Sequence, residues 1–224
     1  MEWINEYGIT LSVDAEGHKH KGKGKDGGQF TSSDSDASRD KLATSFVDNV
    51  SVLIRDKSPS AQTRLEEVLR QTVSGMPSKA LSILSDNLKG VELFKDSKQM
   101  INVLSKRSDG FRLSMSLSHV KEAAGFFDPI TSFVHITSDE GYDSYLHEFA
   151  HAIDHHGIYT KTKEWIECWE KELKSGKLCN YAATLPEEGF AELCRYLYDP
   201  QMNKKLLQKD FPKCTALLKK WGLL

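Results

Sequence analysis

The most informative segment of the chain runs from Tyr145 to Gly157 and reads YLHEFAHAIDHHG. It contains the pattern His147-Glu148-x-x-His151, whose two histidines are four residues apart and therefore share one face of an α-helix. That spacing suits two ligands of a single zinc ion. Glu148 points about 100° around the helix from His147, so it does not join them, but it can reach a water held on the metal. The stretch therefore predicts a zinc-binding helix in which Glu148 is a general base.

The same pattern also occurs in helices whose histidines are hydrogen-bonded within a core, and this is the alternative interpretation of His147 and His151. The flanks favour the metal, because a strand-like segment precedes the helix and Gly157 ends it. His155 lies on the same helical face, but three histidines in a row would span about 12 Å of helix axis, too far for one ion. We therefore expect neither His155 nor His156 to bind the metal.

A catalytic zinc usually has three protein ligands and one open position, so a third ligand is needed. The candidate lies in the amphipathic segment LPEEGFAELCRYL, residues 185–197, where Glu188 and Glu192 share a helical face. We predict that Glu188 is the third ligand. Glu192 lies a full turn inside this helix among apolar residues, and we predict that it orients a zinc-bound histidine through the free N–H of the ring. Competing carboxylates lie in a lysine-rich segment, where solvation explains them more simply: Glu164, Glu167, Glu170 and Glu172.

Together, HEFAHAIDHHG at 147–157 and YAATLPEEGFAELCRYL at 181–197 resemble the catalytic domain of the anthrax toxin lethal factor family, whose members include the Pro-Pro endopeptidases. The resemblance covers roughly residues 76–224 and is strongest over residues 133–198. It implies a zincin-like fold of the gluzincin type and zinc-dependent cleavage of peptide bonds.

Carried over residue by residue, the resemblance places the family's zinc ligands on His147, His151 and Glu188. A tyrosine seven residues before the ligand glutamate is thought to stabilise the oxyanion in this family, and Tyr181 stands at that position. By its residue type alone, Tyr181 would be a packing aromatic in a loop. Gly189 departs from the family, because relatives tend to have an aromatic residue there, and the departure concerns the shape of the pocket and the substrate preference.

Composition and periodicity divide the chain into four parts. Residues 1–14 form a short N-terminal segment, and residues 15–38 form a flexible, disordered linker rich in glycine, serine and lysine, with too few apolar residues to fold. Residues 39–90 form a helical subdomain, and residues 91–224 form the zinc metallopeptidase catalytic domain. The fold class is α+β, with a small mixed sheet and an active-site helix.

Apolar residues at helical spacing predict three helices in the subdomain. The first runs from Arg39 to near Asp56, the second spans residues 58–75, and the third spans residues 76–90. A further short helix is expected around residues 100–104. These patterns predict helices that pack in a core, and they indicate no catalytic or metal-binding residue.

Alternation of apolar and polar residues predicts strands at residues 91–94 and 111–117. Residues 125–127 and 133–136 flank Asp128-Pro129, whose turn chemistry predicts a hairpin. We expect an extended peptide to pair with the strand around residues 132–137, as an added strand of the sheet.

The charge balance excludes a polycation that would select nucleic acid or an anionic membrane, because 30 lysines and arginines stand against 32 acidic residues, a net charge of −2. No apolar run approaches the roughly 18 residues of a membrane span, and acidic residues stand where a signal peptide would have basic ones. The four cysteines form no Cys-x-x-Cys pair, which favours free thiols. We expect a cytoplasmic or phage-associated protein, with export by an unusual route left open.

The segment at residues 18–32, HKHKGKGKDGGQFTS, resembles a short Gly-Lys-rich segment of phage head-morphogenesis proteins and suggests a phage or prophage origin. Two functions follow from the whole sequence. The first is an active zinc endopeptidase that acts on a protein or peptide substrate. The alternative is a catalytically silent phage assembly or binding module that retains the zincin fold.

Overall fold

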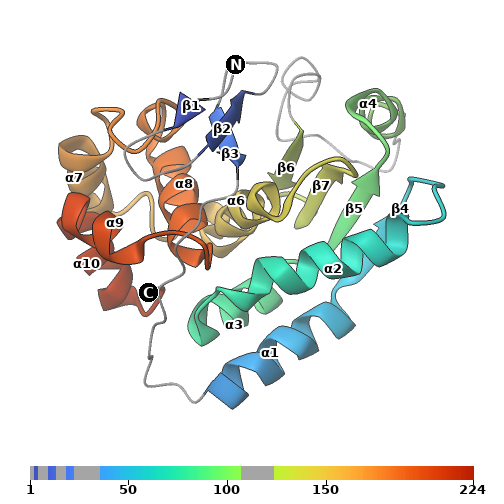
Figure 1. Cartoon of the computed structure of the whole chain (residues 1–224), viewed down its shortest axis with the longest axis horizontal. Coiled ribbons are helices and arrows are strands. Elements are labelled where there is room, and N and C mark those ends of the chain that lie inside the picture. The colour runs from blue at the N-terminus through green and yellow to red at the C-terminus, as the bar shows by residue number, and fades with distance from the viewer. Residues whose placement is uncertain (1–2, 5–9, 14–18, 23–35, 107–123) are drawn as a thin grey trace.

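The computed structural model describes residues 3–4, 10–13, 19–22, 36–106 and 124–224. It contains a four-stranded mixed sheet (Figure 1). The strands, in the order in which they pair, are β4 (Ser51–Ile54), β5 (Gly90–Phe94), β7 (Phe133–Thr137) and β6 (Gly125–Asp128). β4, β5 and β7 are parallel, and β6 is antiparallel to β7. The α+β class and the small mixed sheet are therefore as predicted.

Helices supply most of the remaining described structure. Their bounds are α1 Asp36–Asn49, α2 Ala61–Ser74, α3 Ser78–Asn87, α4 Ser97–Leu104, α6 Tyr142–Ile153, α7 Lys163–Glu172, α8 Pro186–Tyr198, α9 Lys204–Asp210 and α10 Pro212–Trp221. Two short 3₁₀ turns complete the list, η1 His155–Gly157 and η2 Tyr181–Ala183. Among the described segments, no helix combines the length and apolar character that crossing a membrane requires.

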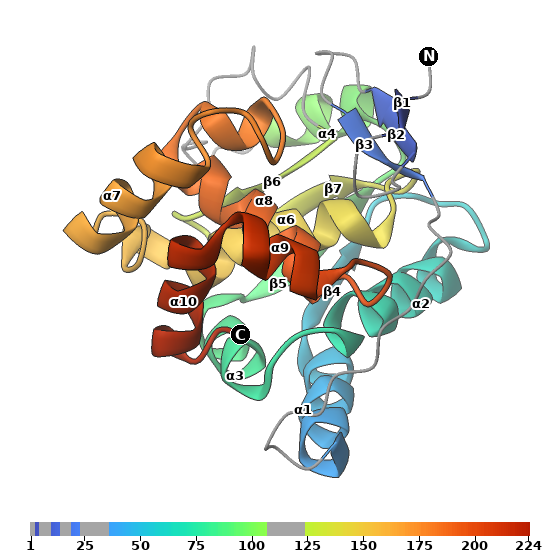
Figure 2. The same cartoon turned by 60° about the vertical axis from the view of Figure 1, so that its left-hand side comes forward.

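α6 lies at the heart of the helical packing. Figure 1 shows α1, α2 and α3 on one side of it and α7 to α10 on the other, and in Figure 2 α9 comes in front of it. Its own apolar residues, such as Phe149 and Ile153, are fully buried and face the core. Strand residues alternate between two environments: Val91 and Leu93 join this main core, whereas Phe94 belongs to a smaller cluster with α4. The buried surroundings fix the position of α6, the helix that carries the His-Glu-x-x-His pattern.

One buried cluster contains residues from both sides of the boundary predicted at residue 90. Leu69 of α2 and Leu84 of α3 belong to the same core as Phe149 of α6 and Leu193 of α8. The division of the chain at residue 90 stays a prediction. In packing terms, the helices before it and the elements after it form one core.

The first predicted helix was wrong in its second half. α1 ends at Asn49, and β4 follows at once, paired in parallel with β5 from Ser51↔Gly90 to Ile54↔Leu93. The apolar residues of β4 fit a helical stripe and a strand equally well, and pairing with β5 decides between them. The second, third and fourth predicted helices are confirmed as α2, α3 and α4.

The predicted hairpin is confirmed as β6 and β7. Asp128 closes it, because its carboxylate accepts hydrogen bonds from the Ile130 backbone N–H at 3.1 Å and from the Thr131 hydroxyl at 2.8 Å. The prediction that a peptide pairs with residues 132–137 was wrong, since β7 already has β5 on one side and β6 on the other. Among the described strands, β6 is the edge on this side of the sheet.

Two predictions concern segments that the structure describes only in part or not at all. Within the predicted linker, residues 15–38, the structure describes a strand, β3 (Lys19–Gly22), which pairs with β2 (Thr10–Val13). β2 also pairs with β1 (Trp3–Ile4). Only residues 19–22 and 36–38 of the linker are described, so its flexibility stays a prediction. The strand predicted at residues 111–117 lies outside the described residues.

Candidate metal centre

α6 places the two histidines of the pattern on one face and ends two residues after the second. Asp154 ends the helix: its buried carboxylate accepts the backbone N–H groups of Tyr159 at 2.7 Å and of Thr160 at 3.1 Å. The chain then turns away as η1, and the His155 ring contacts the carbonyl oxygen of Pro129 at 3.0 Å instead. The early end of α6 explains why His155 does not extend the row of histidines.

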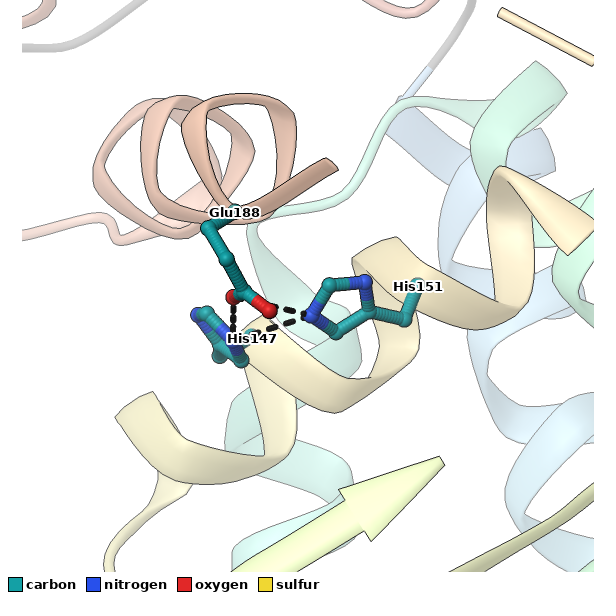
Figure 3. Close-up of side chains that lie close together, drawn as sticks. All are labelled: His147, His151 and Glu188. Atoms are coloured by element: carbon teal, nitrogen blue, oxygen red, sulfur yellow. Dashed lines mark hydrogen bonds and ion pairs between the residues drawn. The ribbon is translucent and has the colours of Figure 1, made fainter. Parts of the chain in front are cut away.

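α8 faces α6 and brings the third side chain. Pro186 opens this helix, where its missing N–H costs nothing, and Glu188 lies in the first turn. Figure 3 shows the Glu188 carboxylate pointing from α8 toward the His147 and His151 rings on α6. In the part of the chain that the structure describes, these three residues are the group whose ligand atoms could hold one metal ion.

The spacing of the three ligand atoms fits a zinc ion. His147 Nε2 lies 3.1 Å from His151 Nε2 and 3.1 Å from Glu188 Oε2, and His151 Nε2 lies 3.3 Å from the same oxygen. Ligands at 2.0–2.1 Å in a tetrahedral zinc site are separated by about 3.3–3.4 Å. The three atoms therefore lie close to the corners of one face of such a tetrahedron. About a fifth of the His151 side chain and of the Glu188 side chain stays exposed, which leaves access for a further ligand.

The outer nitrogen of the His147 ring is held by Glu192. Glu192 Oε1 lies 2.8 Å from His147 Nδ1, so its carboxylate fixes the ring and turns Nε2 toward the cluster. Glu192 Oε2 accepts hydrogen bonds from Arg195 at 2.7 Å and from the Cys179 thiol at 3.3 Å. Burial opposes the charge on Glu192, but Arg195 and His147 outweigh it and lower the pKa of Glu192 to about 2. The carboxylate therefore stays ionised at neutral pH.

The acidic and the basic side chains at the cluster stabilise one another's charged forms, as the pKa values of His147 and Glu188 indicate. Burial alone would lower the pKa of His147, but hydrogen bonds to Glu188 and Glu192 raise it to about 10. Burial likewise opposes the charge on Glu188, and the facing His151 and His147 rings hold the pKa of Glu188 well below its ordinary value. The two acids therefore favour positive charge at the imidazole pair, and a divalent cation would supply that charge in place of the protons.

Glu148 lies beside the cluster without joining it. Its Oε2 accepts a hydrogen bond from the backbone N–H of Phe127 on β6 at 2.7 Å, and the side chain is almost buried. This bond ties the carboxylate to the edge of the sheet. The geometry keeps the Glu148 carboxylate apart from the three possible ligands, and its role as a general base stays a prediction.

Tyr181 also lies at the cluster. Its ring stacks on the His147 ring, with centroids 5.6 Å apart and 28° between the planes, and the Glu188 carboxylate lies near its hydroxyl. Burial raises the pKa of Tyr181, and the carboxylate of Glu188 adds to the effect, so the phenol stays protonated. Residue type alone made Tyr181 a packing aromatic, whereas the family resemblance placed it at the site.

Three residues of the site were missed from the sequence. Arg195 contacts Glu192 and also lies 3.6 Å from Asp143, and Cys179 donates to Glu192. The spacing of three between Glu192 and Arg195 on one helix could have indicated the ion pair. The sequence offered no comparable signal for Cys179 or Asp143, because both come from other elements.

Comparisons with known proteins agree with an α+β protein that carries a candidate metal centre between two helices. A sequence model described as anthrax toxin lethal factor, N- and C-terminal domain, matches residues 61–221. The chain therefore belongs to the anthrax toxin lethal factor family. The segment at residues 18–32, which suggested a phage origin, lies outside the matched residues.

No curated protein sequence matches the chain. Among solved structures, the fold is similar to the structure of the PRO-PRO endopeptidase PPEP-2 from Paenibacillus alvei, with a TM-score of 0.54. That likeness covers 79% of this chain and 99% of the other, at 17% sequence identity. At this identity it shows a common fold.

Proposed function

We propose that the protein is a zinc-dependent endopeptidase with a gluzincin-type zincin fold, in which His147, His151 and Glu188 bind the zinc ion. The observation that carries the proposal is the convergence of three ligand atoms, separated by 3.1–3.3 Å, from two helices. Membership of the lethal factor family supports it, as does the likeness to a fold whose solved example is an endopeptidase. The substrate is then a protein or peptide.

A zinc ion held by these residues supplies a Lewis acid and lowers the pKa of a bound water toward neutrality. Glu148 is the general base: it takes a proton from the attacking water and passes one to the leaving amine. The Phe127 N–H fixes Oε2 of Glu148, so the carboxylate is held in one orientation and its other oxygen carries the proton. Glu192 keeps His147 in place throughout the reaction.

Tyr181 donates its hydroxyl hydrogen to the oxyanion that develops on the scissile carbonyl. The raised pKa of the phenol keeps the proton on Tyr181 at neutral pH, as a donor requires. In other enzymes a single donor of this kind contributes about 2.7–4 kcal/mol to the transition state. The stacking of its ring on His147 holds Tyr181 beside the ligand cluster before the substrate arrives.

The peptide substrate pairs with β6, the edge strand among the described residues, rather than with β7. The Thr137 N–H donates to the Ala124 carbonyl at 3.0 Å, so the alternation of an antiparallel ladder turns the backbone groups of Gly125 and Phe127 away from β7. The Phe127 N–H is already bonded to Glu148. Within the described residues, the remaining outward groups, on Gly125 and the Phe127 carbonyl, have no hydrogen-bond partner, and the added strand pairs there, next to the general base.

Glu148→Gln tests the proposal most directly. We expect the variant to keep about one zinc per chain and to lose cleavage of a peptide library by about 10²–10⁴-fold, because only the proton acceptor is removed. Metal analysis and chelator-sensitive digestion measure the two effects. Glu187→Gln, on an acid of the first turn of α8 outside the cluster, is the matched control and should cleave like the wild type. Stoichiometric zinc with no cleavage by the wild type would instead favour the silent module.

A further inference from the structure

Two tryptophans of α7 hold the segment that carries Tyr181 and Glu188. Trp165 and Trp169 are four residues apart, and both are buried on the same face of α7. The Trp169 indole N–H donates to the carbonyl oxygen of Ala182 at 2.8 Å, and the Trp165 indole N–H donates to that of Pro186 at 2.9 Å. Ala182 directly follows Tyr181 in η2, so the first of these bonds ends next to the proposed oxyanion donor.

Gly189 of α8 allows this close approach of Trp169. A Cβ atom at residue 189 would lie 2.4 Å from Trp169 Cδ1, 2.7 Å from its Nε1 and 2.9 Å from the Ala182 carbonyl oxygen. The indole therefore occupies the space of any side chain at this position. In this chain an aromatic ring from α7 fills the place, which gives the departure at Gly189 a physical explanation.

η2 depends on such outside support because it is a single 3₁₀ turn. Its own backbone bonds run from the Ala183 N–H to the Asn180 carbonyl at 3.1 Å and from the Thr184 N–H to the Tyr181 carbonyl at 3.0 Å. Turns of this length have poor hydrogen-bond geometry and little stability of their own. A buried indole N–H without an acceptor would also lower the stability of the folded state. The bond from Trp169 to Ala182 therefore stabilises both the indole and η2.

We infer that Trp169 is a positioning residue that holds Tyr181 over the His147 ring through the Ala182 carbonyl. The inference rests on the proposed function, in which Tyr181 donates to the oxyanion. Trp169 bonds to Ala182 next to Tyr181 and also packs on Gly189 next to Glu188. An effect through Tyr181 lowers kcat and leaves the zinc content unchanged, whereas an effect through Glu188 lowers the zinc content.

Trp169→Phe is the first test, because phenylalanine keeps a ring over Gly189 but has no N–H. We expect kcat to fall by about 3- to 10-fold, the factor that one neutral hydrogen bond represents, with KM and zinc content unchanged. The matched control is Trp221→Phe, the same chemical change at a ring that packs on Tyr159 and Trp165 instead, and it should leave kcat unchanged. Equal losses in the two variants would overturn the inference.

A double-mutant cycle with Tyr181→Phe separates positioning from a general effect on the structure. If Trp169 acts through Tyr181, the double variant is no slower than Tyr181→Phe alone. If the two losses multiply, Trp169 acts by another route and the inference is wrong.

A measurement without substrate keeps the inference distinct from the proposed function. Amide hydrogen exchange of residues 181–185 should become about 3- to 10-fold faster in Trp169→Phe and should not change in Trp221→Phe. Should the wild type cleave nothing, the proposed function fails, while faster exchange would still show that Trp169 holds η2. Unchanged exchange in Trp169→Phe overturns the inference whether or not the protein is a peptidase.

Discussion

Replacement of Arg195 by methionine should destabilise the protein strongly, because it leaves the Glu192 carboxylate buried without its cation. Both side chains are 4% exposed, and the Arg195 guanidinium lies 2.7 Å from Glu192 Oε2. Arg195 and His147 together lower the pKa of Glu192 despite its burial, so the ionised form depends on both partners. Breaking a buried ion pair by removing one partner costs about 3–5 kcal/mol. We expect a loss of this size in the free energy of unfolding, measured by urea denaturation at pH 7.

The double variant Glu192→Gln/Arg195→Met provides the control. It removes both charges and keeps an oxygen that can accept from His147 Nδ1, so its stability should return to within about 1 kcal/mol of the wild type. Arg195 also lies over the Tyr196 ring at 4.6 Å, and loss of that packing would persist in the double variant. A double variant as unstable as Arg195→Met would therefore refute the electrostatic reasoning.

The same ion pair predicts a dependence of stability on pH. The pKa of Glu192 is lower in the folded state than its ordinary 4.5, so the unfolded chain binds the proton more readily. The stabilisation is therefore complete above about pH 4.5 and is lost as the pH falls toward 2. Urea denaturation between pH 2 and 6 should show a smaller loss on acidification in Arg195→Met than in the wild type.

Three further predictions concern the core, the cysteines and the end of α6. Leu84→Ala should lower the stability by about 2–5 kcal/mol in one cooperative unfolding transition, because Leu84 shares its core with α6; two transitions by calorimetry would indicate separate domains. Burial raises the pKa of Cys179 and of Cys194, so native protein should react with iodoacetamide far more slowly than unfolded protein, as mass spectrometry can measure. Asp154→Ala should cost about 1–3 kcal/mol in thermal unfolding, because it leaves the buried N–H groups of Tyr159 and Thr160 without an acceptor.

The sequence predicted those parts of the site that depend on spacing within one helix. His147 and His151 are four residues apart, and helical geometry alone brings their Nε2 atoms to one side, where they lie 3.1 Å apart. The same geometry excluded Glu148 from the donor set. Tyr181 could not be placed in this way, because its position depends on how η2 packs against α6 and α7.

The limits of prediction in the fold have a similar cause. The run from Val52 to Ile54 satisfies both helical and strand patterns, and only its pairing with β5 makes it a strand. The hairpin of β6 and β7 was readable from the Asp128 turn, but the order of strands in the sheet was not. Since the order decides which strand is the edge, the sequence could not show where an added strand would pair.

Glu188 and Glu192 show how two helical repeats can define a site together. They lie one turn apart on α8, a rise of about 6 Å, and they contact opposite nitrogens of the same His147 ring, Nε2 at 3.1 Å and Nδ1 at 2.8 Å. The imidazole therefore spans one turn of α8. A slip of α8 by one residue would turn both carboxylates by about 100° and remove both contacts at once. The spacing of four between Glu188 and Glu192 on α8 thus matches the spacing of four between His147 and His151 on α6. The register between the two helices places Glu188, rather than Glu192, opposite His151.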